Sequence, residues 1–361
     1  MSSQVVVIGG GVIGLSVALK QVHEKEEVIL IEENSYLGHE ISSRNSGVIH
    51  SGIYYPKNSL KSLLCIRGND LLYEYCNNMQ IPFKKLGKLI FTDKSKLTQL
   101  ESLYNNGTEN GVTGLKLLDR RGISSIEPEL NADYAIFSQN TGIIDVHSLI
   151  NTLSNEFEMK GGLILKKTRF CSAEIHKDKV KVKIQNPDDT NYEFLTDILV
   201  NCSGLFAEYN SNKVQGLEKA DIPIPFHVKG NYFFYAGRNP FKHLIYPIPP
   251  TIGLDIHSTS DMEGRLKFGP DTDFSSVSLE VDNERKSIFL EAIRNYWPSI
   301  TEEKLMPDYV GIRPKIKVKG EVYSDFLLKK HTENYISLYG IESPGLTACL
   351  AIGEEVYNLT Q

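Results

Sequence analysis

The chain has 361 residues, 41% of them hydrophobic and 23% charged, and a formal net charge of −6. This composition is typical of a globular protein, and the length fits two domains or one domain with a large insertion. The acidic balance argues against nucleic acid as a partner, because binding phosphates requires clustered Lys and Arg.

The five cysteines are scattered and form no CxxC pair. This spacing argues against a zinc site and against a disulfide framework, so we expect no metal and five small buried side chains. They are Cys65, Cys76, Cys171, Cys202 and Cys349.

No basic segment or apolar leader precedes the first expected strand, and no apolar run has the length of a membrane span. We therefore expect a cytoplasmic protein. Peripheral contact with the inner membrane is left open.

Apolar runs and helical periodicity predict a βαβ unit at the start of the chain. The further elements of the first part alternate strands with helices, apart from a Gly- and Ser-rich loop and an irregular stretch. In chain order we expect a strand at 5–8, a helix over 12–24, a strand at 28–31, the loop over 35–57, a helix over 60–79, a strand at 87–92, a helix over 94–105, the irregular stretch at 127–142, a helix over 147–160 and a strand at 163–166.

The later part of the chain changes character and then returns to the first style. We expect an antiparallel pair at 171–176 and 180–185, a buried strand at 198–202, antiparallel sheet over 222–268 and a helix over 284–295. A strand at 336–339 and a helix over 343–359 close the chain.

Three glycines with GxGxxG spacing, Gly9, Gly11 and Gly14, stand between the first strand and the first helix. The first permits a tight turn, the second lets a pyrophosphate approach the backbone, and the third lets helix and strand pack closely. Glu32 ends the second strand, where a carboxylate accepts hydrogen bonds from ribose hydroxyls. These features predict a dinucleotide site, but they do not decide between NAD and FAD.

The loop after Glu32, which contains SSRNSGVIHSGIYYP, makes the resemblance specific. With VNCSGLFAE, VKGNYFFY, YVGIRPKI and GIESPGLTACLAIGEEV, it resembles the D-amino-acid-oxidase superfamily of FAD enzymes. SSRNSGVIHSGIYY, KGNYF, LIYPIPP and KFGPD are most similar to the L-2-hydroxyglutarate dehydrogenases and oxidases within it. One departure is that Asp271 and Thr272 follow Pro270, so the substrate edge is expected to differ.

The resemblance implies an α/β fold (α+β overall). A discontinuous Rossmann-like FAD-binding domain would carry an inserted antiparallel β-rich substrate or cap domain. The FAD-binding domain would comprise 1–80, 141–215 and 310–361, and the cap domain 81–140 and 216–309.

By position, the resemblance gives the ADP half of FAD to the three fingerprint glycines and Glu32. A dipole at the start of the last helix would face the flavin. The residues implied at the pyrophosphate, the flavin and the adenosine end are Ser43, Arg44, Asn45, Ser46, Gly47, Gly204, Gly345, Leu346 and Thr347. No cysteine lies between Val310 and Leu346, so non-covalent FAD is expected.

The implied reaction is the oxidation of a 2-hydroxy acid to a 2-oxo acid, by hydride transfer from C2 to flavin N5. Arg313 is the expected carboxylate clamp, since a guanidinium grips a carboxylate through two parallel hydrogen bonds. His50 and His257 compete as the base, because the pKa of histidine suits proton transfer near neutrality. Lys229, with Arg265 behind it, is expected to meet the far carboxylate of a diacid. Four tyrosines are expected to wall the pocket: Tyr54, Tyr55, Tyr232 and Tyr246.

Three alternatives stay open. A D-amino acid or glycine oxidase of the same superfamily would keep Arg313 but would need no strong base. A non-catalytic flavin-binding partner protein would lack a closed pocket with an arginine beside the flavin. A nicotinamide dehydrogenase would purify colourless. The electron acceptor, whether oxygen, a quinone or another flavoprotein, is not encoded in these motifs.

Overall fold

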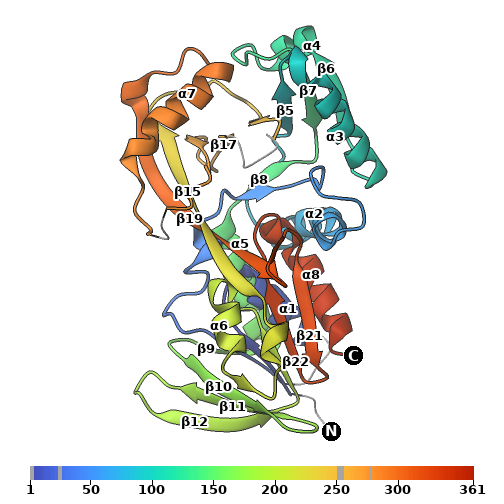
Figure 1. Cartoon of the computed structure of the whole chain (residues 1–361), viewed down its shortest axis with the longest axis vertical. Coiled ribbons are helices and arrows are strands. Elements are labelled where there is room, and N and C mark those ends of the chain that lie inside the picture. The colour runs from blue at the N-terminus through green and yellow to red at the C-terminus, as the bar shows by residue number, and fades with distance from the viewer. Residues whose placement is uncertain (1–3, 23–26, 250–255, 276–277) are drawn as a thin grey trace.

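The fold is that of a computed structural model of the chain, which describes residues 4–22, 27–249, 256–275 and 278–361. Figure 1 shows two large sheets, one in the lower and one in the upper half of the view, joined by the long strands β15 and β19.

The lower sheet has six strands in the order β21-β22-β13-β1-β2-β9. Neighbouring strands run parallel except β21, which is antiparallel to β22. Because parallel sheets are covered on both faces, their strands are continuous apolar runs, and this is why the βαβ unit is visible in the sequence. The strands are β1 (Gln4–Ile8), β2 (Glu27–Ile31), β9 (Leu163–Leu165), β13 (Ile198–Asn201), β21 (Leu327–Thr332) and β22 (Tyr335–Tyr339).

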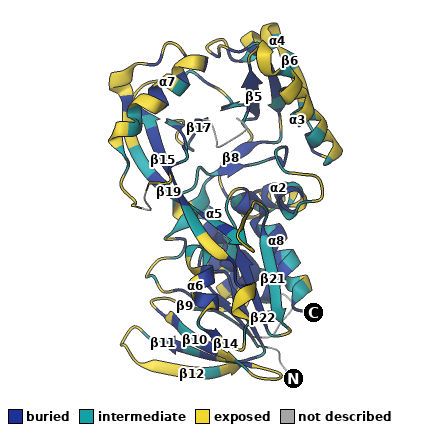
Figure 2. Ribbon diagram, viewed as in Figure 1, coloured by how far each residue is buried: buried dark blue, intermediate teal, exposed yellow. Residues whose placement is uncertain are grey.

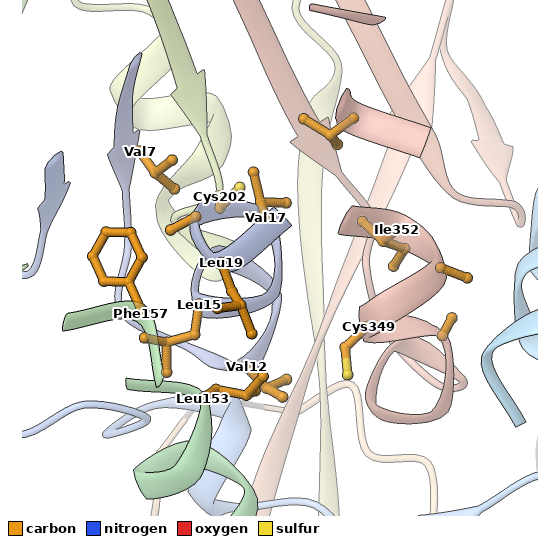
Figure 3. Close-up of a cluster of buried hydrophobic side chains, with 14 of the residues drawn as sticks. Val7, Val12, Leu15, Val17, Leu19, Leu153, Phe157, Cys202, Cys349 and Ile352 are labelled. Atoms are coloured by element: carbon orange, nitrogen blue, oxygen red, sulfur yellow. The ribbon is translucent and has the colours of Figure 1, made fainter. Parts of the chain in front are cut away.

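Four helices pack with this sheet: α1 (Val12–Val22), α2 (Leu60–Met79), α5 (Val146–Met159) and α8 (Gly345–Leu359). Helix α1 lies between α5 and α8, and α8 also packs on α2. Figure 3 shows the core that results, with Leu15 and Leu19 of α1 close to Leu153 and Phe157 of α5. The expected helices over 12–24 and 343–359 are therefore confirmed in type, although the end of the first at residue 24 lies outside the described residues.

The upper sheet has nine strands in the order β20-β19-β15-β18-β17-β16-β5-β7-β6. Neighbours are antiparallel except β5 and β16, which run parallel. The strands are β5 (Lys88–Thr92), β6 (Leu115–Asp119), β7 (Tyr134–Ser138), β15 (Ile224–Tyr235), β16 (Leu244–Pro247), β17 (Ser258–Ser260), β18 (Leu266–Phe268), β19 (Leu305–Val318) and β20 (Glu321–Tyr323). The helices beside it are α3 (Leu97–Glu109), α4 (Arg120–Ile126) and α7 (Lys286–Tyr296).

Two smaller sheets complete the fold, together with the short helix α6 (Ala207–Ser211). One is the exposed sheet at the foot of Figure 2, where β12 is largely exposed. It consists of β10 (Arg169–Ile175), β11 (Val180–Gln185), β12 (Asn191–Thr196) and β14 (Val214–Gln215). The other joins the two halves and consists of β3 (Val48–Ile49), β4 (Phe83–Lys84) and β8 (Gly142–Ile144).

Two expectations are wrong. The stretch at 127–142 is not irregular, because β7 pairs there with both β5 and β6. Its covered faces leave no alternation of polar and apolar residues for a sequence pattern to show. Of the five cysteines, all unpaired, Cys171 is only half-buried, whereas the other four are buried.

Within the described residues, no helix is long and apolar enough to cross a membrane. Nor does that part of the chain gather three or more His, Cys, Asp or Glu side chains into a group that could hold a metal ion.

Candidate active site

A cavity of about 930 Å³ extends from the glycine fingerprint to the upper sheet. Most of the residues singled out in the sequence line it, although they come from distant parts of the chain. The lining includes Gly9, Gly11, Glu32, Arg44, Asn45, Ser46, His50, Gly204, Tyr232, Tyr246, His257, Arg313, Gly345 and Leu346. Gly14, Ser43, Gly47, Thr347 and Lys229 are not part of this lining.

The three fingerprint glycines occupy a turn that has no space for larger side chains. Gly9 has a φ of +104°, and a Cβ at Gly14 would lie 1.9 Å from the carbonyl oxygen of Gly9. A Cβ at Gly11 would lie 3.0 Å from Ser42 Oγ, which accepts a hydrogen bond from Val12 N. The turn therefore presents bare backbone and the start of α1 to the cavity, as a pyrophosphate site requires.

Glu32 is held in place at the end of β2. Its Oε2 accepts a hydrogen bond from Gly10 N at 2.7 Å, and its Oε1 accepts one from Asn34 N at 2.7 Å. Asn34 Nδ2 also donates to Oε1 at 2.9 Å, so of the roughly four lone-pair sites of a carboxylate about one, on Oε2, remains for a donor in the cavity. The position fits the binding of ribose hydroxyls.

The loop after Glu32 is stabilised by its own side chains. Ser43 Oγ donates to His39 O, and Asn45 Oδ1 accepts a hydrogen bond from Gly47 N, where φ is +66°. Ser43 and Gly47 therefore shape the loop, whereas Arg44, Asn45 and Ser46 face the cavity.

Gly204 and Glu208 line the end of the cavity that is remote from the upper sheet. Glu208 is buried, its Oε2 has no hydrogen-bond partner in the part of the chain that the structure describes, and burial raises its pKa to about 7. An unpaired buried carboxyl group against a cavity indicates a ligand with hydrogen-bond donors. Adenine and ribose both carry such donors.

The start of α8 lies against β3, which His50 directly follows. Gly345 and Leu346 line the cavity, whereas Thr347 is buried behind them. Thr347 Oγ1 accepts a hydrogen bond from His50 N at 2.9 Å and donates one to Val48 O at 3.3 Å. Thr347 therefore fixes the backbone of His50 relative to the helix N-terminus.

Arg313 reaches the cavity from β19, which is tied to the loop of Arg44. A Cβ at Gly311 would lie 2.7 Å from Arg44 O, and Tyr309 OH donates to Asn45 O at 3.0 Å. Arg313 Nη2 donates to the backbone oxygen of Asp271 at 2.8 Å. Asp271, where this sequence differs from the family it resembles, thus has a structural role. Its buried carboxylate accepts a hydrogen bond from Asn231 N and pairs with Arg285.

The two histidines lie at the same end as Arg313. His50 Nε2 is 3.3 Å from Ser343 Oγ, and its Nδ1 is buried without a partner. Burial first, and then the charge of Lys88 and the neighbouring His257, hold the pKa of His50 well below its usual value. Burial, followed by the charges of Lys88 and Arg313, lowers the pKa of His257 to about 3. Both rings are therefore neutral at pH 7 and free to accept a proton.

Lys229 does not face the cavity. It is buried, its Nζ donates to Glu280 O at 2.7 Å, and Asp273 Oδ2 lies 4.0 Å away. Arg265 is also directed elsewhere, because it pairs with Asp261 and Asp308. This geometry argues against the expected contact of Lys229 with a far carboxylate, since its charge already has partners.

Of the four tyrosines expected to wall the pocket, Tyr232 and Tyr246 line the cavity, whereas Tyr54 and Tyr55 do not. Tyr232 stacks on Tyr309 with centroids 4.3 Å apart, and burial raises its pKa to about 12. These two tyrosines are therefore neutral hydrogen-bonding walls at physiological pH.

Sequence reasoning missed Lys88. Its side chain is fully buried at the start of β5, within 4.7 Å of the ring centroid of the lining residue Tyr246. A lysine that begins an apolar strand normally extends into solvent, so its sequence context gives no signal. Its contact with Tyr246, which lines the cavity and stacks on His257, places it beside this end of the cavity.

These features together fit FAD. The glycine turn and Glu32 suit an ADP moiety, Glu208 supplies an unpaired acceptor, and the cavity continues to an end built of Arg313, His50, His257 and aromatic walls.

Comparison with known proteins agrees with this fit. The model of a family described as "DAO: FAD dependent oxidoreductase" matches residues 4–359. The mitochondrial L-2-hydroxyglutarate dehydrogenase of Arabidopsis thaliana is 35% identical, with 98% of this chain and 82% of the relative covered. That of Homo sapiens is 32% identical, over 100% of this chain and 89% of the relative.

Solved structures show the same fold. L-α-glycerophosphate oxidase from Mycoplasma pneumoniae with FAD bound has a TM-score of 0.88 at 22% identity, covering 100% of this chain and 95% of that one. Glycine oxidase from Geobacillus kaustophilus has a TM-score of 0.81 at 17% identity, covering 99% and 95%. The family model over residues 4–359 and the relatives at 32–35% identity establish that the chain belongs to the DAO family of FAD-dependent oxidoreductases.

Proposed function

We propose that this protein oxidises L-2-hydroxyglutarate to 2-oxoglutarate with non-covalently bound FAD. The observation that carries the proposal is that Arg313, His50 and His257 line one end of the cavity whose other end is the glycine turn. The relatives named as L-2-hydroxyglutarate dehydrogenases supply the identity of the substrate.

Arg313 binds the C1 carboxylate in this proposal. Its Nη2 is anchored on Asp271 O, and a guanidinium keeps further N–H groups for a carboxylate. Because the anchor fixes the plane of the guanidinium, it also fixes which face of the substrate C2 turns toward the bound cofactor.

His257 takes the proton of the C2 hydroxyl. The hydroxyl is one carbon from the carboxylate that Arg313 holds, and the charge of Arg313 is felt by His257. Neither ring nitrogen of His257 has a hydrogen-bond partner among the described residues, whereas His50 Nε2 contacts Ser343. A bound carboxylate neutralises Arg313, so the pKa of His257 rises when substrate binds and the imidazole becomes a stronger base. His50, which lines the same end of the cavity, orients the substrate.

Bound FAD supplies the acceptor for the two electrons that leave C2 with its hydrogen. The fingerprint glycines, Glu32 and the residues 44–46 would hold it, and the start of α8 would lie beside its ring system. Non-covalent binding is proposed because no cysteine lies between Val310 and Leu346. The proposed FAD-binding domain is 1–80, 141–215 and 310–361, and the proposed cap domain is 81–140 and 216–309.

The test is anaerobic reduction of the purified holoenzyme. L-2-hydroxyglutarate should bleach the flavin colour, whereas D-2-hydroxyglutarate, glycine and D-alanine should not. Arg313→Met should lower kcat/KM by about 10²- to 10³-fold, since losing a charged hydrogen-bonded contact costs several kcal/mol. Bleaching by glycine or D-alanine instead would establish an amino acid oxidase, and a coloured protein that no substrate bleaches would indicate a flavin-binding partner protein.

The electron acceptor is identified by reoxidising the reduced protein with oxygen, with a quinone or with another flavoprotein. We propose a cytoplasmic location with peripheral membrane contact when the acceptor is a quinone. Fractionation of cells that express the protein tests this.

A further inference from the structure

Lys88 is a buried cation without a counter-ion. Its side chain has an exposed fraction of 0%, and its Nζ has no hydrogen-bond partner among the described residues. Its Nζ lies 4.5 Å from the ring centroid of Tyr54 and 4.7 Å from that of Tyr246. Contact with two aromatic faces offsets only part of the free energy that burying an ammonium costs. The described residues therefore provide no counter-ion for the ammonium form, and burial lowers the pKa of Lys88 to about 7.

This charge lies at the wall of the substrate end. In the register of β5 with β16, Lys88 is opposite Leu244 and Ile90 is opposite Tyr246, so Lys88 and Tyr246 project from the same face of the sheet. Tyr246 lines the cavity and stacks on His257. One ring of the wall therefore contacts both the ammonium and the imidazole.

The substrate end has excess positive charge. Arg313 lines it, and Lys88 lowers the pKa of both His50 and His257, so its field reaches the cavity. The lining carboxylate Glu342 is already paired with Lys61 and Lys315. A substrate with two carboxylates would balance this excess.

Only one of the two carboxylates of 2-hydroxyglutarate is accounted for by Arg313. Lys229 is unsuited to the second, because its Nζ is occupied by Glu280 O and lies near Asp273. Lys88, by contrast, is buried beside this end, and its Nζ has no hydrogen-bond partner within the described ranges.

We propose that Lys88 receives the far carboxylate of a dicarboxylic 2-hydroxy acid and makes the site select a diacid over a monoacid of the same length. The inference rests on the proposed function for the identity of the substrate class. Lys88 is not among the residues that line the cavity, so contact requires a rotamer change of its flexible four-carbon side chain.

The titration of Lys88 agrees with this assignment. Burial lowers its pKa to about 7, and the titratable groups around it are His50, Tyr54, Cys65, Tyr246 and His257. At mildly alkaline pH the free amine is mostly neutral, so an incoming second carboxylate must draw a proton onto it.

The first experiment measures binding to the holoenzyme by perturbation of the flavin spectrum. The probes are glutarate and pentanoate, which have equal length and differ in one carboxylate. Wild type should bind glutarate more tightly, and Lys88→Met should raise the Kd of glutarate about 10- to 100-fold while leaving that of pentanoate unchanged, as expected for a lost charged contact. Lys116→Met, an exposed lysine on β6 of the same sheet, is the matched control and should change neither value.

Kinetics with 2-hydroxyglutarate and 2-hydroxypentanoate give a second reading. Lys88→Met should raise KM for the diacid with little change in kcat, because the lost contact is the same in the ground state and the transition state. An equal loss for both acids would show a structural role, and an intact preference for the diacid would assign the contact to another residue. Either result overturns the proposal.

A third measurement needs no variant. Calorimetric titration of wild type at mildly alkaline pH, in two buffers of different ionisation enthalpy, should show proton uptake with glutarate and less with pentanoate; equal uptake overturns the proposal. Failure of the proposed function gives a different result: the holoenzyme would still prefer glutarate to pentanoate, but 2-hydroxyglutarate would not bleach its flavin.

Discussion

Tyr246 stacks on His257 with ring centroids 3.9 Å apart and ring planes 7° from parallel. Tyr246 belongs to β16, His257 immediately precedes β17, and both rings line the cavity. Stacking fixes the tilt of the imidazole, because rotating the ring out of plane would lose the contact. The direction in which His257 presents its nitrogens is therefore set by a neighbouring strand.

We expect Tyr246→Ala to lower kcat/KM for L-2-hydroxyglutarate about tenfold, since a stacked aromatic pair is worth about 1 kcal/mol and proton transfer requires alignment. Tyr246→Phe keeps the ring and should stay close to wild type. Steady-state kinetics on both variants check this. Equal losses in the two would mean that the hydroxyl, and not the stack, is important.

His257→Ala should lower kcat about 10²- to 10⁴-fold with a small change in KM, as expected for loss of a general base. His50→Ala should lower kcat less and raise KM, because His50 orients the substrate. Stopped-flow measurement of anaerobic flavin reduction separates the chemical step from release of product. The roles would have to be exchanged if His50→Ala gave the larger loss in the rate of reduction.

The pH profile of kcat/KM for the diacid should extend to unusually low pH on its acid side and should fall on its alkaline side. A base must be neutral to accept a proton, and the pKa of His257 is lowered to about 3, so activity should persist below pH 6. On the alkaline side Lys88, with its pKa lowered to about 7, loses its charge as pH rises, so kcat/KM for the diacid should fall there. The profile for 2-hydroxypentanoate should lack this alkaline fall. Parallel profiles for the two acids would exclude Lys88 as the cause.

Gly311→Ala should weaken FAD binding at least about tenfold, because the new Cβ would lie 2.7 Å from Arg44 O and would push β19 away from the cofactor loop. Titration of the apoprotein with FAD measures the Kd. Gly122→Ala in α4 is the control, since its Cβ has no neighbour closer than 3.3 Å and alanine favours a helix. An unchanged Kd for FAD in Gly311→Ala would show that the loop of Arg44 moves aside without weakening cofactor binding.

Lys88→Met should stabilise the protein near neutral pH. In the folded state the pKa of Lys88 is about 7, below its ordinary value of 10.5, so the unfolded chain binds more protons between these values. The free energy of unfolding of the wild type therefore rises as pH increases from 7 toward 10.5. Below pH 7 the buried ammonium lowers it by the full amount. The variant should be more stable by at least about 1 kcal/mol at pH 7 and below, with the difference shrinking toward pH 10. Thermal melts across this range test it, and a variant less stable at pH 7 would contradict it.

The features that sequence reasoning found are those that local chemistry encodes. The GxGxxG turn, the apolar strands of the parallel sheet and Glu32 follow from short-range rules, because a tight turn requires glycine and a strand covered on both faces is continuously apolar. Arg313 was proposed from the resemblance of YVGIRPKI to the family and from the fit of a guanidinium to a carboxylate. The strand β7 was missed because its partners β5 and β6 supply the burial that its own pattern does not show.

The sequence by itself therefore determined the dinucleotide turn, the βαβ unit and the types of residue available for the chemistry. Only the tertiary structure decided which cations meet in the cavity. Lys229 and Lys88 both look like ordinary strand lysines in the sequence, yet one finds Glu280 O and Asp273 while the other finds only aromatic rings. The reason is physical: the state of a buried charge depends on partners brought by distant segments, and no local pattern records which partner arrives.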